Sequence, residues 1–234
     1  MGRALKILAI ADLHGRVDRL KSLEPGDSDL IVVCGDLHNG GSEEEARPVI
    51  EALSALGLPV LIVPGNMDPR TFATRLWDEA GFVSLHRRAY CYGNGDYGFI
   101  GMGGIVARGG RDPDNPARQY HRDEDVYENL SRAYGEISNA SRKIVVTHQP
   151  PNGFLDTLYN KEPSGSVGLR KFLEERQPDL LLCGHIHEAR GVARLGRTLG
   201  VNVGELRCGY SALVELNDDI RVHWSPDPRG LKAY

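Results

Sequence analysis

Six short apolar runs constrain the fold of this chain more than any other feature. They are rich in Val, Ile and Leu and lie at residues 4–11, 29–34, 59–64, 98–102, 143–148 and 179–183. A strand with one solvent face alternates polar and apolar residues, whereas a strand buried on both faces is apolar throughout. Each run is far shorter than the ~20 residues needed to cross a bilayer. The runs therefore predict buried strands of an α/β sheet.

Helix-like segments separate these runs. They lie at residues 43–56, 70–80, 123–139 and 166–176. The first opens with acidic residues that suit a helix N-terminus, but Pro48 favours a helix start near that proline. The last is expected to be capped near Ser164 or Ser166 and to stop before Pro178. The strand–helix alternation predicts parallel strands in the first half of the chain.

The pattern changes after residue 183. The runs GVARL, TLGVNVG, SALVEL and IRVHWS are short, alternating and separated by turn residues. They predict antiparallel strands, with Asp218-Asp219 at one hairpin turn. Two Gly/Pro-rich segments, 103–122 and 149–165, are expected to form long loops, which often carry function. No low-complexity linker interrupts the 234 residues, so we expect one domain over residues 1–234.

Charge and cysteine usage narrow the possible partners. The formal net charge is −4, whereas proteins that bind duplex DNA or anionic membranes are usually basic. We therefore expect neither nucleic acid nor membrane as a partner. The four cysteines form no CxxC pair, and Cys34 and Cys183 end apolar runs. Cys34 and Cys183 are therefore expected to be buried thiols. We expect a cytoplasmic protein with reduced cysteines and without a signal peptide. A homodimer is the default oligomer.

Potential metal ligands follow five of the six runs. In chain order they are Asp12 and His14, Asp36 and His38, Asn66 and Asp68, His148, and His185 and His187. Sheets of this class bind ligands at the carboxyl ends of their strands, and carboxylates and imidazoles suit Zn, Mn, Fe, Ni and Co. The Asp12-x-His14 and His185-x-His187 spacings would direct both side chains to one side of an extended segment. An ordinary loop role would explain one such motif, but not five in order.

These motifs resemble the signature of the calcineurin-like metallophosphoesterase family. The matching blocks are Asp12-Leu-His14, Gly35-Asp36, Gly65-Asn66-Met67-Asp68, His148 and Gly184-His185-Ile-His187. The segment GRTLGVNVG also resembles one that follows the last block in bacterial and archaeal members. The resemblance implies a four-layer α/β/β/α sandwich, in which two mixed sheets lie between helices. It also implies two divalent transition metals (Mn, Fe, Zn, Ni or Co) and a bridging hydroxide that attacks phosphorus.

The resemblance also assigns roles to individual residues. Asp12, His14 and His187 would hold one metal; Asn66, His148 and His185 would hold the other; and Asp36 would bridge the two. Asp68 is expected to orient Asn66 or a neighbouring backbone group. Substrate contacts are expected from Met67 and from Gly103 and Gly104, although this glycine pair could equally form a plain turn.

Met67 departs from the family pattern. Most members carry a histidine there, which contacts the phosphate and can protonate the leaving oxygen, whereas a thioether cannot donate a proton. General acid catalysis is typically worth ~100-fold to ~10,000-fold. Three interpretations follow: the enzyme works without the acid and favours good leaving groups; His38, on the rim of the site, replaces it; or the protein is a metal-bound scaffold, as in the retromer subunit that resembles this family. The complete ligand set favours the first two, and a solvent-exposed loop position is the competing interpretation of His38.

The remaining histidines and the arginines of the long loop are not expected to bind metal. His86 and His121 lack metal-ligand spacing and are expected at the surface. Arginines 108, 111 and 118 of the long loop could contact a phosphate, but Asp112 and Asp114 favour an internally paired loop. The expected function is hydrolysis of a small phosphodiester or an activated phosphomonoester. A nuclease is the enzymatic alternative, and the acidic charge and short chain argue against it.

Overall fold

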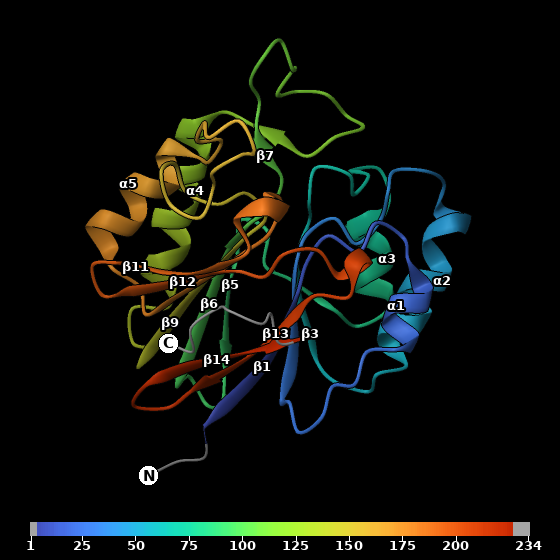
Figure 1. Ribbon diagram of the computed structural model, residues 1–234, viewed down its shortest axis with the longest axis horizontal. Helices are drawn as coiled ribbons and strands as arrows, with labels where there is room; N and C mark the ends of the chain where they lie inside the picture. The colour runs from blue at the N-terminus through green and yellow to red at the C-terminus, as the bar shows by residue number, and fades with distance from the viewer. Residues whose placement is uncertain (1–3, 227–234) are drawn as a thin grey trace.

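The computed structural model describes residues 4–226 and contains two six-stranded mixed sheets between two groups of helices. Figure 1 shows α1, α2 and α3 outside one sheet and α4 and α5 outside the other. The predicted four-layer α/β/β/α arrangement is therefore confirmed.

The first sheet has the strand order β14-β13-β1-β2-β3-β4. Its parallel strands are β1 (Leu5–Ile10), β2 (Leu30–Cys34), β3 (Val60–Val63) and β4 (Val83–Ser84). The strands β13 (Ser211–Leu216) and β14 (Ile220–Ser225) extend it in antiparallel pairs beside β1. The first three apolar runs of the sequence thus form the centre of this sheet.

The second sheet has the strand order β11-β12-β10-β9-β6-β5. Its parallel strands are β6 (Tyr97–Met102), β9 (Arg142–Thr147), β10 (Leu180–Cys183) and β12 (Thr198–Asn202). Its antiparallel edges are β5 (Ala89–Tyr92) and β11 (Gly191–Leu195). The other three apolar runs form its centre. Two short strands, β7 (Ile105–Val106) and β8 (Tyr120–His121), pair at the base of the loop between them.

The C-terminal strands were only partly anticipated. The hairpins β11–β12 and β13–β14 are antiparallel as predicted, and Asp218-Asp219 lies in the turn of the second hairpin. However, β12 runs parallel to β10, and the two hairpins join different sheets. Alternating polarity predicts a strand and its buried face, but not the neighbour with which it pairs.

Four helices follow the predicted segments closely: α2 (Glu43–Ser54), α3 (Ala73–Glu79), α4 (Asp123–Glu136) and α5 (Val167–Arg176). A short helix, α1 (Val17–Lys21), was not predicted. The Ser166 hydroxyl caps α5 by accepting the backbone N–H of Leu169 at 3.0 Å. No helix in residues 4–226 is long and apolar enough to cross a membrane.

The expectation that the 43–56 helix starts near Pro48 is wrong, because α2 starts at Glu43 and holds Pro48 inside it. Ser42 and Glu45 form a capping box: the Ser42 hydroxyl accepts the Glu45 backbone N–H, and the Glu45 carboxylate accepts the Ser42 backbone N–H. This reciprocal cap satisfies donors at the helix start, so the helix extends one turn before the proline.

Three apolar cores hold the layers together. The central core combines side chains from both sheets, such as Ile7 and Val32 from the first and Phe99 and Leu182 from the second. A second core lies between the first sheet and α1–α3, and a third between the second sheet and α4–α5. Cys34 and Cys183 are buried, unpaired thiols, as expected.

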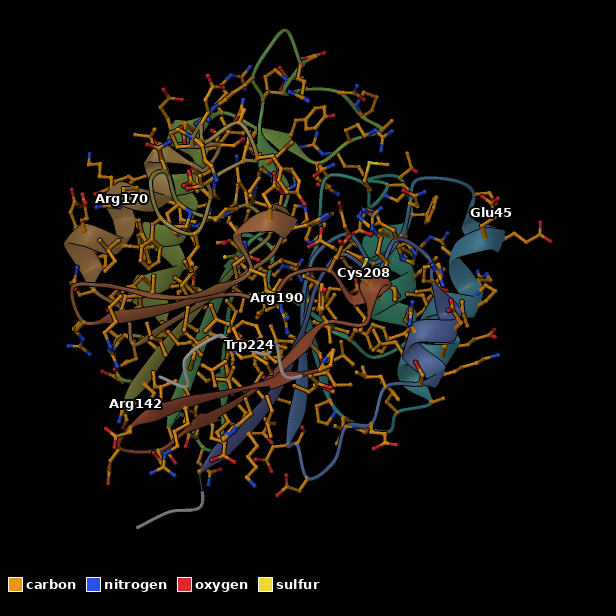
Figure 2. The ribbon with its side chains drawn as sticks, viewed as in Figure 1. Glu45, Arg142, Arg170, Arg190, Cys208 and Trp224 are labelled. Atoms are coloured by element: carbon orange, nitrogen blue, oxygen red, sulfur yellow. The ribbon has the colours of Figure 1, made fainter. Side chains whose placement is uncertain are left out.

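Polar contacts outside the apolar core also join the two sheets. Arg142 on β9 donates to the carbonyl oxygens of Asn217 and Asp218 in the β13–β14 turn, at 2.6 and 2.9 Å. Arg190, just before β11, stacks on Tyr210 and on Trp224 of β14, with its guanidinium carbon 4.1 and 4.5 Å from the ring centroids. Figure 2 shows Arg190 and Trp224 side by side between the two sheets.

Candidate metal centre

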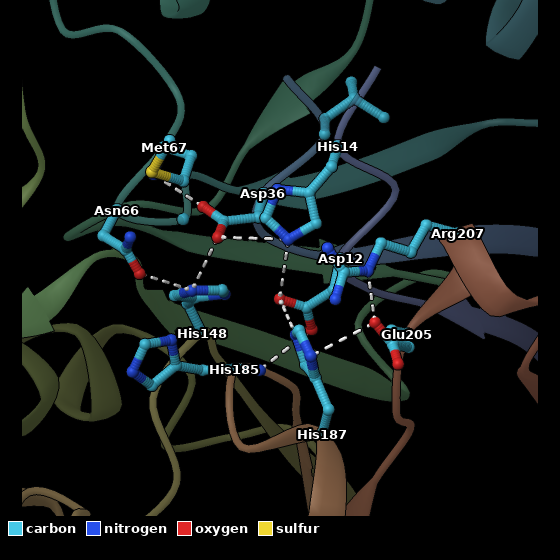
Figure 3. Close-up of polar contacts among 12 residues, drawn as sticks. Asp12, His14, Asp36, Asn66, Met67, His148, His185, His187, Glu205 and Arg207 are labelled. Carbon is cyan, nitrogen blue, oxygen red and sulfur yellow. Dashed lines mark hydrogen bonds and ion pairs between the residues drawn. The ribbon is translucent and has the colours of Figure 1, made fainter. Parts of the chain in front are cut away.

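The candidate ligands converge where the carboxyl ends of strands from both sheets meet. Asp12, Asp36 and Asn66 follow β1, β2 and β3 of the first sheet. His148 follows β9, and His185 and His187 follow β10 of the second sheet. Figure 3 shows these residues gathered in one cluster, with the ring of His185 at its margin beside His148. The prediction from strand ends thus brings together residues up to 175 positions apart in the chain.

One group of ligand atoms consists of Asp12, His14 and His187, whose atoms lie within 4.8 Å of one another. The Asp12 Oδ1 atom is 3.2 Å from His187 Nε2 and 3.9 Å from His14 Nε2. This is the set expected to hold the first metal.

A second group consists of Asp12, Asp36 and His148. The Nε2 atom of His148 is 3.5 Å from Asp36 Oδ2 and 3.1 Å from Asn66 Oδ1. His14 Nε2 lies 3.8 Å from the same Asp36 oxygen. Ligand atoms of both expected sets therefore lie within 4 Å of one Asp36 oxygen.

His185 belongs to neither of these groups. Its backbone N–H donates to Asp12 Oδ2 at 2.9 Å, and its ring lies against that of His148, with centroids 4.9 Å apart. Burial, followed by the nearby His148 charge, lowers the pKa of His185 to about 4. A neutral imidazole is the form that binds a metal.

The unfilled bonding capacity of the cluster suits a cation. His14 Nδ1 is buried and has no hydrogen-bond partner in residues 4–226, and the buried Asp12 Oδ1 lies 3.2 Å from His187 Nε2 without a hydrogen bond of good geometry. The His148 ring is fully buried, which by itself lowers its pKa, but the Asp36 and Asp12 carboxylates outweigh burial and raise the pKa to about 9. His148 Nδ1 lies 2.8 Å from the Cys34 carbonyl oxygen, so Nε2 faces the carboxylates. Oriented imidazoles around buried carboxylates form a transition-metal donor set.

The backbone reaches this geometry through left-handed conformations. Asp12, His14, Asp36 and His185 have φ values of 52°, 50°, 51° and 66°. His187 begins a 3₁₀ turn. The expectation that Asp12-x-His14 and His185-x-His187 are extended segments is therefore wrong. Non-glycine residues in this region cost about 1 kcal/mol or more each and cluster at functional sites. The side chains converge because the chain turns sharply at each strand end.

Two glycines before ligands permit close approach of the backbone. A β-carbon at Gly65 would overlap the carboxylate and backbone nitrogen of Asp36, and one at Gly184 would lie 2.5 Å from Asp12 Oδ2. These glycines therefore have a steric role, since no side chain fits there.

Asp68 fixes the backbone of the segments that carry Asp36 and Asn66. Its carboxylate accepts the backbone N–H groups of Gly65 and His38 at 2.7 Å each, and that of Leu37 at 3.4 Å. Of the two expected partners, it therefore orients backbone groups rather than Asn66. Burial, with the nearby Asp36 charge, raises the pKa of Asp68 to about 7.

His38 does not lie on the rim of the site, nor is it an exposed loop residue. It is 2 % exposed, and its ring stacks on Trp77 at a centroid distance of 6.3 Å and an angle of 15°. Neither ring nitrogen has a hydrogen-bond partner in residues 4–226, and burial lowers its pKa to about 4. Such a ring is uncharged near neutral pH and lacks the second, acidic proton of an imidazolium, so it is poorly suited to act as the missing acid.

Gly103 and Gly104 use their backbone groups within the protein. The Gly104 N–H donates to the Pro64 carbonyl at 2.6 Å, and the Gly103 N–H donates to His86 Nδ1 at 3.0 Å. His121 Nε2 lies 2.5 Å from the Gly103 carbonyl oxygen. The pair thus forms an internal turn, the alternative to substrate contact. His121 is buried and His86 partly buried, so their expected surface positions are wrong.

Met67 lies beside Asp36 (Figure 3). Its backbone N–H donates to Asp36 Oδ1 at 2.7 Å, which fixes the carboxylate opposite His148. This contact uses only the backbone, so the side chain at position 67 can vary without loss of this hydrogen bond.

Glu205 was missed at the sequence level. Its Oε2 atom lies 3.2 Å from His187 Nδ1 and accepts a hydrogen bond from Arg207 Nε. Glu205 follows β12 with no metal-ligand spacing, although the GRTLGVNVG segment that it directly follows was noticed. Its contact turns Nε2 of His187 toward Asp12.

Comparison with known proteins settles the family. The family model described as calcineurin-like phosphoesterase matches residues 5–189. The chain belongs to this family. A Methanocaldococcus jannaschii relative, described as an uncharacterized protein, is 30% identical over 209 residues, which cover 86% of this chain and 89% of the relative. Human metallophosphoesterase domain-containing protein 1 is 42% identical over 69 residues, which cover 29% of this chain and 21% of that protein.

Two solved structures share the fold of this phosphoesterase-family chain. A Thermus thermophilus protein has a TM-score of 0.77 at 21% identity, covering 94% of this chain and 98% of its own. A dimetal phosphatase from Danio rerio has a TM-score of 0.67 at 12% identity, covering 95% and 96%. At these identities the likeness concerns the fold alone.

Proposed function

We propose that this chain is a dinuclear-metal-dependent phosphoesterase that acts on a small phosphodiester or an activated phosphomonoester. The observation that carries the proposal is the position of Asp36, whose Oδ2 atom lies 3.8 Å from His14 Nε2 and 3.5 Å from His148 Nε2. A single carboxylate between two imidazole-containing ligand groups suits a bridge between two cations.

Seven residues would hold the two ions. Asp12, His14 and His187 would bind one, Asn66, His148 and His185 the other, and Asp36 both. Two such cations generate a nucleophile from water at neutral pH and neutralise charge on phosphoryl oxygens. The His185 ring lies against the ring of His148, which belongs to the same expected set.

The residues of this chain would hold the metal ions and the ester, but they would not donate a proton to the leaving oxygen. Met67 cannot donate one, and the buried ring of His38 stacks on Trp77. Activity is therefore expected to depend steeply on the pKa of the leaving alcohol. Esters of acidic alcohols need no protonation and would be hydrolysed fastest.

One experiment tests the proposal. The purified protein is stripped of metal, reloaded with Mn, Ni, Co or Zn, and assayed with bis-p-nitrophenyl phosphate and p-nitrophenyl phosphate. Bound metal is counted in the same samples. We expect turnover that requires metal. Two bound ions without turnover for any of the metals would contradict the enzymatic proposal and favour a metal-bound scaffold.

A further inference from the structure

We propose that Arg118 binds the substrate phosphate at the place where most family members carry the histidine that Met67 replaces. This inference rests on the proposed phosphoesterase function and deepens it. It assigns the phosphate-binding cation to the long loop between β7 and β8, far in sequence from the five ligand motifs.

The first argument is the position of the guanidinium. Arg118 Nη1 lies 2.9 Å from the sulfur of Met67, the residue next to Asn66 and hydrogen-bonded to Asp36 through its backbone. The same nitrogen is 4.0 Å from where a β-carbon of Gly40 would lie. The guanidinium is therefore held between the segments that follow Asp36 and Asn66, at the edge of the candidate metal centre.

The second argument is that this charge is uncompensated. Within residues 4–226, no carboxylate lies within 4.0 Å of Arg118, although the loop contains acids. Asp114 pairs with Arg122 at 3.0 Å, and Asp112 accepts the Asp114 backbone N–H. The expected internal pairing of the loop thus exists, but it omits Arg118. A thioether is a weak, uncharged acceptor, so it holds the guanidinium without neutralising it.

The third argument is that the loop is fastened next to Arg118. Arg70 donates to the Gln119 side chain at 3.3 Å and to the carbonyl oxygens of Tyr120 and Asn115 at 3.3 and 3.5 Å. The pairing of Ile105 with Tyr120 closes the base of the loop. Arg118 is therefore presented from an anchored segment, which lowers the entropy lost when it binds an anion.

The chemistry of Met67 and Arg118 explains why an arginine at position 118 is compatible with a methionine at position 67. A guanidinium binds two phosphate oxygens through parallel N–H groups and stays charged at all physiological pH values. It can hold and stabilise a phosphoryl group, but it cannot protonate a leaving oxygen. An imidazolium at position 67 would repel Arg118, whereas Met67 accepts its N–H. Compared with family members that carry a histidine at position 67, this site lacks the proton donor and has the Arg118 guanidinium, which binds anions more strongly than an imidazole.

The test measures binding of inorganic phosphate to the metal-loaded protein by calorimetry, without turnover. Arg118→Gln is expected to weaken phosphate binding roughly tenfold or more, while bound metal and thermal stability stay as in the wild type. Arg118→Lys keeps the charge but loses the two-pronged contact, so its affinity should fall in between. The matched control is Arg111→Gln, because Arg111 is an exposed arginine of the same loop whose guanidinium donates to the Arg108 carbonyl oxygen and not to Met67. This variant should bind phosphate like the wild type.

Several outcomes would overturn the inference. It is wrong if the wild type does not bind phosphate, if Arg118→Gln binds phosphate as tightly as the wild type, or if Arg111→Gln loses as much affinity. It is also wrong if the weaker phosphate binding of Arg118→Gln is accompanied by loss of bound metal or of thermal stability, and Arg118→Lys loses metal or stability in the same way. A protein that binds phosphate through Arg118 but hydrolyses no ester would contradict the proposed function alone. Equal kcat/KM for esters in wild type and Arg118→Gln would contradict the Arg118 inference alone.

Ester kinetics add a readout that a structural role would not move. Because Arg118 supplies charge and no proton, Arg118→Gln should lower kcat/KM by a similar factor for good and poor leaving groups. Its effect should be larger for dianionic monoesters than for monoanionic diesters, since a removed cation costs the more highly charged substrate more.

Discussion

The two ring nitrogens of His187 face opposite carboxylates: Nδ1 lies 3.2 Å from Glu205 Oε2, and Nε2 lies 3.2 Å from Asp12 Oδ1. Such outer carboxylates fix the tautomer and orientation of ligand imidazoles, and their loss typically lowers metal affinity ~10-fold to ~100-fold. We therefore expect Glu205→Gln to weaken one metal site by that factor while the other keeps its affinity, as measured by calorimetric metal titration.

The control for this change is Glu215→Gln. Glu215 is similarly buried and also pairs with a cation, Lys6, but it lies on β13 away from the cluster. Equal losses of affinity in both variants would mean that Glu205 acts through general stability and not through His187.

Replacement of the proposed bridge should separate folding from metal binding. In Asp36→Asn the amide oxygen can still accept the Met67 N–H, so the local turn is expected to survive. The variant loses the negative charge between the two groups and should lose one of the two ions together with turnover. Elemental analysis and circular dichroism check this, and an Asp36→Asn protein that keeps both ions and full activity would refute the bridging role.

Gly65 should tolerate no side chain. A β-carbon there would overlap Asp36, so Gly65→Ala is expected to destabilise the fold by about 1–3 kcal/mol and to displace the carboxylate. Gly135→Ala, in α4, meets no atom within 4 Å and should be neutral or stabilising by up to about 1 kcal/mol. Chemical denaturation compares the two, and similar losses of stability would contradict the steric argument.

Introduction of a histidine at position 67 should change the leaving-group dependence. Met67→His offers a proton donor beside Asp36, so hydrolysis of alkyl phosphate esters should rise by up to ~100-fold, while p-nitrophenyl esters change little. Met67→Gln, which has no titratable group, is the control. The gain should be larger when Arg118→Gln is also present, because the guanidinium opposes protonation of the new imidazole.

The buried His121 should make the metal-free protein sensitive to acid. Burial, aided by the charges of Arg87 and Arg70, lowers its pKa to about 4 from 6.5. The unfolded chain therefore binds the extra proton first. The contribution of neutral His121 to the free energy of unfolding is complete above pH 6.5 and falls by up to about 3 kcal/mol as the pH drops toward 4. His121→Gln, which can still donate to Gly103, should flatten this part of the curve of Tm against pH, whereas the exposed His223→Gln should not.

Strand-end residues could be predicted because hydrophobic runs fix where strands end, and parallel strands align those ends. Asp12, Asp36, Asn66 and His148 were found in this way, without knowledge of the sheet order. The left-handed backbone at Asp12 and Asp36 was not predictable, since no local pattern distinguishes it from an extended DxH or GD segment. Only the crowding around the cluster selects that conformation.

Burial of isolated polar residues was equally inaccessible to sequence reasoning. His38 and His121 lie in polar stretches that predict exposure, yet Trp77 covers one ring and the Gly103 turn covers the other. Glu205 and Arg118 carry no motif, because each acts through a partner more than ten residues away. Such contacts depend on how loops fold over the sheet edges.

The division of the ligands between two sheets gives the proposed ions a mechanical role. Asp12, Asp36 and Asn66 come from one sheet and His148 and His187 from the other, so bound ions would act as cross-links that close a chain segment of more than 170 residues. Chelation would then do more than stop catalysis: it would remove these cross-links. The two halves of the sandwich would still be joined by their apolar interface, by Arg142 and Arg190, and by hydrogen bonds such as that between His148 Nδ1 and the Cys34 carbonyl oxygen, but opening between the halves would become easier.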